Sequence, residues 1–108
     1  MTKKELNKLL PLSETSFYIL LCLRKEAHGY AIMQQVKELT EGRIPLGPGT
    51  VYGSLGKMEK DGLIRVVTEE KRRKVYTLTE SGRTLLGLEI RRLGELVANA
   101  GDQGREKR

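Results

Sequence analysis

The sequence contains no tryptophan, and cysteine, histidine and phenylalanine occur once each. A single cysteine, Cys22, excludes an intramolecular disulfide, and its neighbours in "FYILLCLR" predict a buried thiol. The single histidine, His28, has no cluster of further ligands around it, which argues against a metal site. The chain also lacks a phosphate-binding loop motif and clustered carboxylates. We therefore expect no enzyme, no metal and no cofactor.

Long apolar runs are missing as well. No run approaches the roughly 20 residues that cross a bilayer. The start, "MTKKELNKLL", lacks the apolar region of a signal peptide. We expect a cytoplasmic protein without membrane contact. With 108 residues, of which 38% are hydrophobic, it should form one domain whose small core a partner subunit would help to cover.

Positive charge is in excess, and the formal net charge is +6. Residues 63–78 contain five basic and two acidic side chains. The N-terminal stretch contains Lys3, Lys4 and Lys8 and one acidic residue, Glu5. Either stretch, taken alone, is best interpreted as a charged segment exposed to solvent. Together they carry half or more of the excess, which favours a polyanion as partner.

Capping residues and apolar spacing divide the first half of the chain into helices. Ser13 is a good N-cap for a helix whose body, residues 17–23, is apolar on all sides. A second helix is predicted over residues 29–41, with Gly42 as its C-terminal stop. Its apolar stripe consists of Ile32, Met33, Val36 and Leu39.

The second half begins with a glycine-rich helix that Pro48 opens and Gly62 ends. Residues 63–78 then indicate two short strands around a charged turn. Thr79 and Glu80 open a last helix of about 20 residues. The order predicts a mainly α fold with a small β-hairpin, a winged helix-turn-helix with a C-terminal dimerisation helix.

We expect four segments. They are an N-terminal basic helical arm (1–11), a winged helix-turn-helix DNA-binding domain (12–78), a C-terminal dimerisation helix (79–100) and a disordered tail (101–108).

The apolar stripe of the last helix covers about 140° of the helical wheel, more than one small contact requires. We expect a homodimer, because an exposed stripe of that size would promote aggregation. The N-terminal leucines 6, 9 and 10 are expected to cover part of it. The predicted interface residues are Leu86, Glu89, Ile90, Leu93, Leu96 and Val97.

Glu89 lies inside this stripe, and a buried carboxylate needs a partner. Arg92, three residues on, is one candidate, and an arginine of the other subunit is another. An interface ion pair and a ligand-sensing role are both open at this point.

Two faces of the glycine-rich helix differ sharply. Val51, Leu55 and Met58 fall on one side, which should pack on the core. Gly49, Gly53 and Gly56 fall on the opposite side together with Lys57 and Lys60, as suits a helix whose backbone approaches DNA closely. The major groove admits one helix, which a helix-turn-helix inserts N-terminus first. The predicted DNA-binding residues here are Gly49, Thr50, Tyr52, Gly53 and Lys57.

Two alternatives remain open on this helix. Tyr52 lies about 100° from the core direction, so a packed ring with a solvated hydroxyl competes with a dedicated phosphate contact. The glycines are also compatible with a merely permissive surface.

The charged turn predicts a wing that lies along the DNA backbone. Its basic residues are Lys71, Arg72, Arg73 and Lys74, and the two arginines are the best candidates for the minor groove. Tyr76, on the returning strand, is predicted to be structural.

The segments "LSETSFYILLCL", "HGYAIMQQV", "LGPGTVYGSLGKMEKDGLI", "KRRKVYTLTESG" and "LLGLEIRRL" together resemble the PadR family of bacterial transcriptional regulators. The resemblance implies a winged-helix homodimer that binds a palindromic operator in double-stranded DNA, usually as a repressor that a small-molecule effector releases. It further implies DNA contacts from the recognition helix, from the wing and from Tyr30 at the start of the second helix. A planar-drug site built on a tryptophan is not implied, because Leu93 stands at that position. The alternative function is a winged-helix protein-interaction module without DNA binding.

Overall fold

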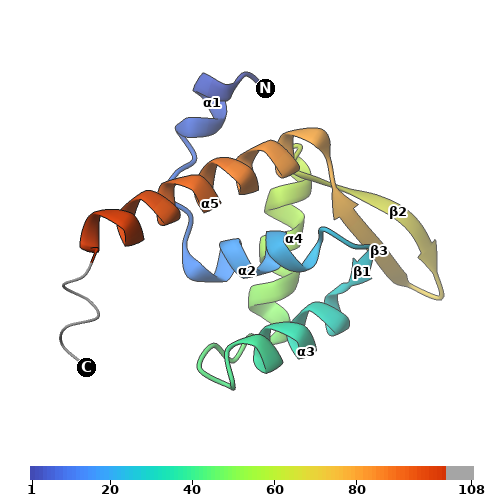
Figure 1. Ribbon diagram of the computed structural model, residues 1–108. Coiled ribbons are helices and arrows are strands. Elements are labelled where there is room, and N and C mark those ends of the chain that lie inside the picture. Colours follow the sequence, from blue (N-terminus) through green and yellow to red (C-terminus); the bar gives the residue numbers. More distant parts are fainter. Residues whose placement is uncertain (102–108) are drawn as a thin grey trace.

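The computed structural model describes residues 1–101 of the chain. The predicted disordered tail, apart from Gly101, lies outside the described residues. This part of the chain forms five helices and three strands, which Figure 1 labels. In order they are α1 (Lys3–Asn7), α2 (Glu14–Cys22), β1 (Ala27–His28), α3 (Gly29–Leu39), α4 (Pro48–Lys60), β2 (Ile64–Glu70), β3 (Arg73–Leu78) and α5 (Glu80–Ala100). The predicted winged helix-turn-helix with a long C-terminal helix is confirmed.

The helices begin where the sequence predicts. The Ser13 hydroxyl accepts a hydrogen bond from the Ser16 N–H (3.1 Å), and the Thr79 hydroxyl accepts one from the Gly82 N–H (3.1 Å). Each satisfies a backbone donor that a helix start leaves unpaired. Pro48 occupies the first turn of α4, where its missing N–H costs nothing.

The end of α3 differs from the prediction. The helix stops at Leu39 rather than near residue 41, and Gly42 follows with a φ of +79°. Leu39 is the last residue of the predicted apolar stripe, but it is 58% exposed, whereas Ile32 and Val36 of the same stripe are fully buried. The last turn of the helix carries Leu39 past the edge of the core.

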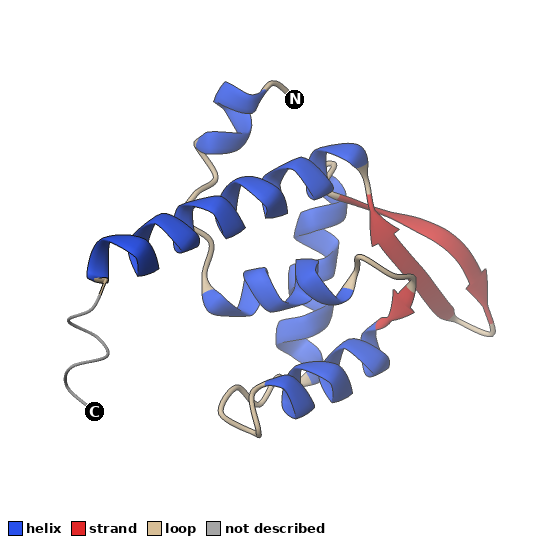
Figure 2. Cartoon of the chain, in the orientation of Figure 1, coloured by secondary structure: helices blue, strands red, loops and turns tan. Residues whose placement is uncertain are grey.

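The sheet has three antiparallel strands rather than the predicted two, in the order β1-β3-β2 (Figure 2). The hairpin pairs Ile64 with Leu78 at its base and Glu70 with Arg73 at its tip. The unpredicted strand β1 pairs Ala27 with Tyr76 and His28 with Val75. The start of α3 is thereby joined to the wing by backbone pairing.

The core lies between α2, α3, α4 and the first half of α5. Its fully buried apolar side chains include Ile19, Leu20, Leu23, Ile32, Val36, Val51, Leu55 and Leu85. At the start of α5 the backbone of Gly82 runs against the Leu63 carbonyl, and a Cβ at this position would overlap that carbonyl. Only glycine permits this approach of α5 to the base of the hairpin.

Helix α1 packs against α5, and its Leu6 side chain is only 1% exposed. Beyond this contact the C-terminal half of α5 extends past α2 (Figure 1). Ile90, Leu96 and Val97 are exposed there, and Leu93 is half-buried. In residues 1–101, no helix combines the length and the hydropathy that crossing a membrane requires.

Candidate nucleic-acid interface

Helix α4 presents the two faces that its sequence predicts. Val51 and Leu55 are fully buried, and Met58 is nearly so. Gly49, Gly53 and Gly56 are exposed, and a Cβ built on any of the three would meet no neighbouring atom within 4 Å. The outward face therefore consists of bare backbone over about two helical turns.

The N-terminus of α4 adds unpaired donors to this face. Gly47 is its N-cap and supplies no side-chain hydrogen bond. The first backbone N–H groups of the helix are therefore open, and they carry the positive end of the helix dipole. Gly49 and Thr50 are exposed at this end. Backbone N–H groups, a hydroxyl and a positive dipole make a site suited to phosphate.

Lysines flank the glycine face at the other end of α4. The Lys57 side chain is 80% exposed, and its Nζ lies 3.4 Å from the Asp61 carboxylate. An exposed pair of this kind is weak, about 0.3–0.5 kcal/mol, so Lys57 can leave it for a phosphate at small cost. Lys60 is exposed as well.

A groove of about 360 Å³ runs between α4, the start of α3 and the wing. It brings together residues that the sequence predicts separately as DNA contacts, namely Tyr30, Tyr52, Arg72, Arg73 and Lys74. Lys57 is not part of this groove; it borders a smaller hollow beside the α1–α2 connection. The predicted DNA contacts of α4 therefore divide between two sides of the helix.

The groove also contains residues that sequence reasoning did not assign to it. Glu59 and His28 line it, and the His28 Nδ1 caps α3 by accepting a hydrogen bond from the Ala31 N–H (3.4 Å). Tyr76 forms part of the wall and is buried, in agreement with its predicted structural role. Burial raises the pKa of Tyr76, and the nearby Glu59 carboxylate adds to the shift. The helical spacing of Glu59 from Tyr52 is the signal that could have placed it here.

The wing ends in a two-residue turn whose backbone is strained. Lys71 has a φ of +47° and Arg72 a φ of +68°. Such a turn prefers Asn-Gly or Asp-Gly, because left-handed backbone costs other residues roughly 1–2 kcal/mol each. All four basic residues from Lys71 to Lys74 are exposed. The chain thus carries two cations at its tip where Asn-Gly or Asp-Gly would fit the turn with less strain.

Glu89 is buried at 1% exposure in the middle of α5. Its carboxylate accepts hydrogen bonds from Arg92 at 2.5 and 3.1 Å, which is the partner predicted within the chain. It also accepts one from the Leu12 N–H at 2.8 Å, which the sequence did not predict. These bonds, those from Arg92 above all, hold the pKa of Glu89 below its usual range.

The structure divides the six predicted interface residues into two groups. Leu86 and Glu89 are covered by the chain's own atoms. Ile90, Leu96 and Val97 are exposed and Leu93 is half-buried, so these four are the ones that a second subunit can reach.

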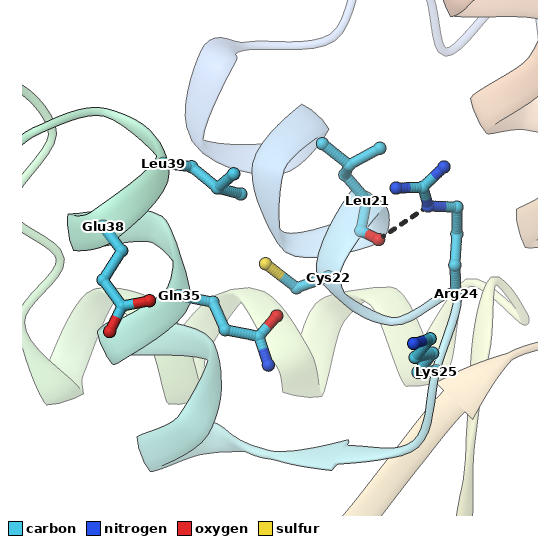
Figure 3. A pocket seen from close by; sticks show the side chains of 7 residues that line it. All are labelled: Leu21, Cys22, Arg24, Lys25, Gln35, Glu38 and Leu39. Carbon is cyan, nitrogen blue, oxygen red and sulfur yellow. Dashed lines mark hydrogen bonds between the residues drawn. The ribbon is translucent and has the colours of Figure 1, made fainter.

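A second groove, of about 710 Å³, lies between the end of α2 and α3 (Figure 3). Cys22 points into it from α2, and Gln35, Glu38 and Leu39 border it from α3. Burial raises the pKa of the Cys22 thiol, in keeping with its prediction as a buried hydrophobe. Within residues 1–101 no three ligating side chains gather into a metal site.

Comparison with known proteins gives a consistent result. Residues 19–88 match the transcriptional regulator PadR-like family. The transcriptional regulator Rv3488 of Mycobacterium tuberculosis is 36% identical over 75 residues, which cover 67% of this chain and 67% of that protein. The transcriptional regulator YqjI of Escherichia coli is 34% identical over 59 residues, or 55% of this chain.

This chain spans only part of some relatives. It covers 28% of YqjI and 19% of a 37.1 kDa protein from a Streptomyces fradiae transposon. Among solved structures, a PadR family transcription regulator from Clostridium difficile aligns with a TM-score of 0.72 at 26% identity. That alignment covers 83% of this chain and 97% of the other.

Proposed function

Because this chain belongs to the PadR-like family of transcriptional regulators, we propose that it acts as a homodimeric repressor that binds a palindromic DNA operator. A small-molecule effector would release it. The observation that carries the proposal is the bare, lysine-flanked face of α4 beside a basic wing. A protein-interaction module would instead be expected to present acidic or apolar side chains on that face.

The proposed DNA contacts follow from what each group can offer. The N-terminus of α4, with Gly49 and Thr50, would face phosphates at the groove edge. Gly53 would let the α4 backbone lie close to base edges, and Lys57 would reach a phosphate or a guanine edge. Tyr30, Tyr52 and the wing would follow the sugar-phosphate backbone.

The dimer is supported by the apolar half of α5. Leu96 and Val97 are exposed and Leu93 is half-buried. All three belong to the half of α5 that extends past α2 (Figure 1). If this stripe packs against the same stripe of a second subunit, the result is a dimer with two-fold symmetry. A dimer of this symmetry binds two inverted half-sites of a DNA operator.

Selection of bound sequences from random double-stranded DNA, with the purified protein, tests the proposal. We expect a pseudo-palindrome whose half-sites lie about one or two helical turns apart. Its affinity should fall steeply with salt, because lysines and arginines displace counterions. Recovery of no enriched sequence would favour the interaction module, and an enriched site without inverted symmetry would contradict the dimer.

The double substitution Arg72→Ala and Arg73→Ala tests the wing. We expect operator affinity to fall about tenfold and the slope of log affinity against log salt to decrease by about 2, because two phosphate or minor-groove contacts are lost. Fluorescence anisotropy over a series of salt concentrations measures both quantities. Lys4→Ala with Lys8→Ala removes the same charge from the N-terminal arm and should cost less. Equal losses for the two variants would mean that only net charge matters and that the wing assignment is wrong.

A further inference from the structure

The phenol ring of Tyr52 lies where a side chain at position 29 would be. A Cβ built on Gly29 would lie 2.6 Å from Cε1 of Tyr52, 2.7 Å from Cζ and 2.9 Å from the hydroxyl oxygen. Real Cβ atoms essentially never come closer than 3.0 Å to such neighbours. Any residue other than glycine at position 29 therefore forces the ring of Tyr52 to move.

Backbone conformation gives no other reason for a glycine here. Gly29 is the first residue of α3 and its φ lies outside the left-handed region, so alanine suits the backbone. The exposed glycines of α4 differ, because a Cβ on Gly49, Gly53 or Gly56 meets open space. What sets Gly29 apart is its contact with the recognition helix.

The Tyr52 ring packs against the backbone at the start of α3, and this backbone is fixed by hydrogen bonds. His28 pairs with Val75 of β3 and caps α3 through its Nδ1. The residue before Val75 is Lys74, one of the basic residues of the wing. Tyr52 is thus packed against a segment that is joined to the wing by the sheet.

The outer part of Tyr52 stays accessible. The residue is 51% exposed and lines the groove that also contains Tyr30, Arg73 and Lys74. The contact with Gly29 lies at the phenol end of the ring, so the hydroxyl lies next to the start of α3. A hydroxyl that is held in place loses little freedom when it binds a ligand.

We propose that Gly29 is a positioning residue for DNA binding. Because Gly29 has no side chain, the Tyr52 ring packs against its backbone. In this position the Tyr52 hydroxyl and the basic wing bind the same stretch of DNA backbone. The inference rests on the proposed DNA-binding function. It resolves the two interpretations of Tyr52, because one ring is both packed and available to a phosphate.

The test is a double-mutant cycle between Gly29→Ala and Tyr52→Ala, read by anisotropy on the selected operator. Gly29→Ala alone should weaken binding about tenfold, the size of one lost hydrogen bond to a charged group. In the Tyr52→Ala background the same substitution should change affinity by less than about twofold, because no ring is left to displace. Gly87→Ala, at an exposed helical glycine with open space around it, is the matched control and should leave affinity unchanged.

A second measurement needs no DNA. The wild-type protein should give nuclear Overhauser effects between the Gly29 Hα atoms and the Tyr52 ring protons, and these should vanish in Gly29→Ala while the melting temperature stays within a few degrees. If wild-type protein binds no operator, the proposed function fails, and the Overhauser effects still report on the contact. Two outcomes would contradict the positioning role in a protein that does bind the operator. The Gly29→Ala variant could bind as tightly as wild type, or the substitution could weaken binding by the same factor with Tyr52 and with Ala at position 52.

Discussion

Gly53→Leu is expected to remove sequence-specific DNA binding while leaving the fold intact. The position is exposed, and a Cβ there meets nothing within 4 Å, so a larger side chain fits the free protein. Leucine also favours a helix over glycine by roughly 0.8 kcal/mol. In the major groove the same side chain would stand between the α4 backbone and the base edges. We expect a loss of about 100-fold or more in operator affinity, toward the level of non-specific binding.

Three measurements separate this effect from loss of structure. Thermal unfolding should show a melting temperature equal to or above that of the wild-type protein. Gly53→Ala, which adds only one methyl group, should lose much less affinity, and Gly87→Leu places the same leucine on an exposed position of α5 as a control. A folded Gly53→Leu variant that binds the operator normally would show that the bare face of α4 is turned away from DNA.

The features that local sequence determines were predicted well. Caps such as Ser13 and Thr79 act within one helical turn, so their partners are known from spacing alone. The two faces of α4 follow from its 3.6-residue period in the same way. The exposure of Leu39 was not predicted, because periodicity gives the side of the helix on which a residue lies but not where the neighbouring core ends.

Contacts between distant segments were missed for a different reason. Strand β1 has two residues, too few for any period, and it exists because β3 offers an open edge. The contact between Gly29 and Tyr52 depends on how α3 crosses α4. A glycine at the start of a helix looks the same in the sequence whether space is needed there or not.

In the candidate site, too, local features could be predicted from the sequence and contacts between distant segments could not. The basic wing and the glycine face were each predicted from their own residues, whereas their common groove with Tyr30 and Glu59 is a product of the fold. Glu59 places a negative charge among the cations of that groove. A carboxylate at this place lowers the positive charge of the groove.

Glu89 links the connection between α1 and α2 to α5 through one buried carboxylate. The carboxylate accepts a hydrogen bond from the N–H of Leu12, which lies at the junction of α1 and α2. It accepts another from the guanidinium of Arg92, which is on α5 itself. The bond to Leu12 spans 77 residues of sequence. The junction between the N-terminal arm and the DNA-binding part is therefore fixed to the same helix that carries the proposed dimer stripe.

Glu89→Ala is expected to lower the free energy of unfolding by about 2–3 kcal/mol at pH 7. The substitution leaves the Leu12 N–H without its acceptor and Arg92 without its counter-charge, and it removes a fully buried side chain. Because the folded pKa of Glu89 is lowered, its carboxylate stabilises the protein above the unfolded pKa, roughly 4.3, and this contribution is lost as the pH falls through the folded pKa. The stability difference between wild type and variant should therefore shrink in acid. Urea unfolding between pH 3 and 7 measures it.

The matched control is Glu14, which forms an ion pair of similar length with Arg43 at 2.7 Å. Both partners of that pair are more than half exposed, so solvent screens their attraction and Glu14→Ala should cost far less than Glu89→Ala. Glu89→Gln keeps an acceptor for Leu12 but loses the charge, and we expect a cost between the two alanine variants. Amide exchange at Leu12 should accelerate strongly in Glu89→Ala and only slightly in Glu89→Gln. If Glu89→Ala costs as little as Glu14→Ala, the buried carboxylate does not fix the arm to α5, and its retention inside an apolar stripe would point to the sensing role instead.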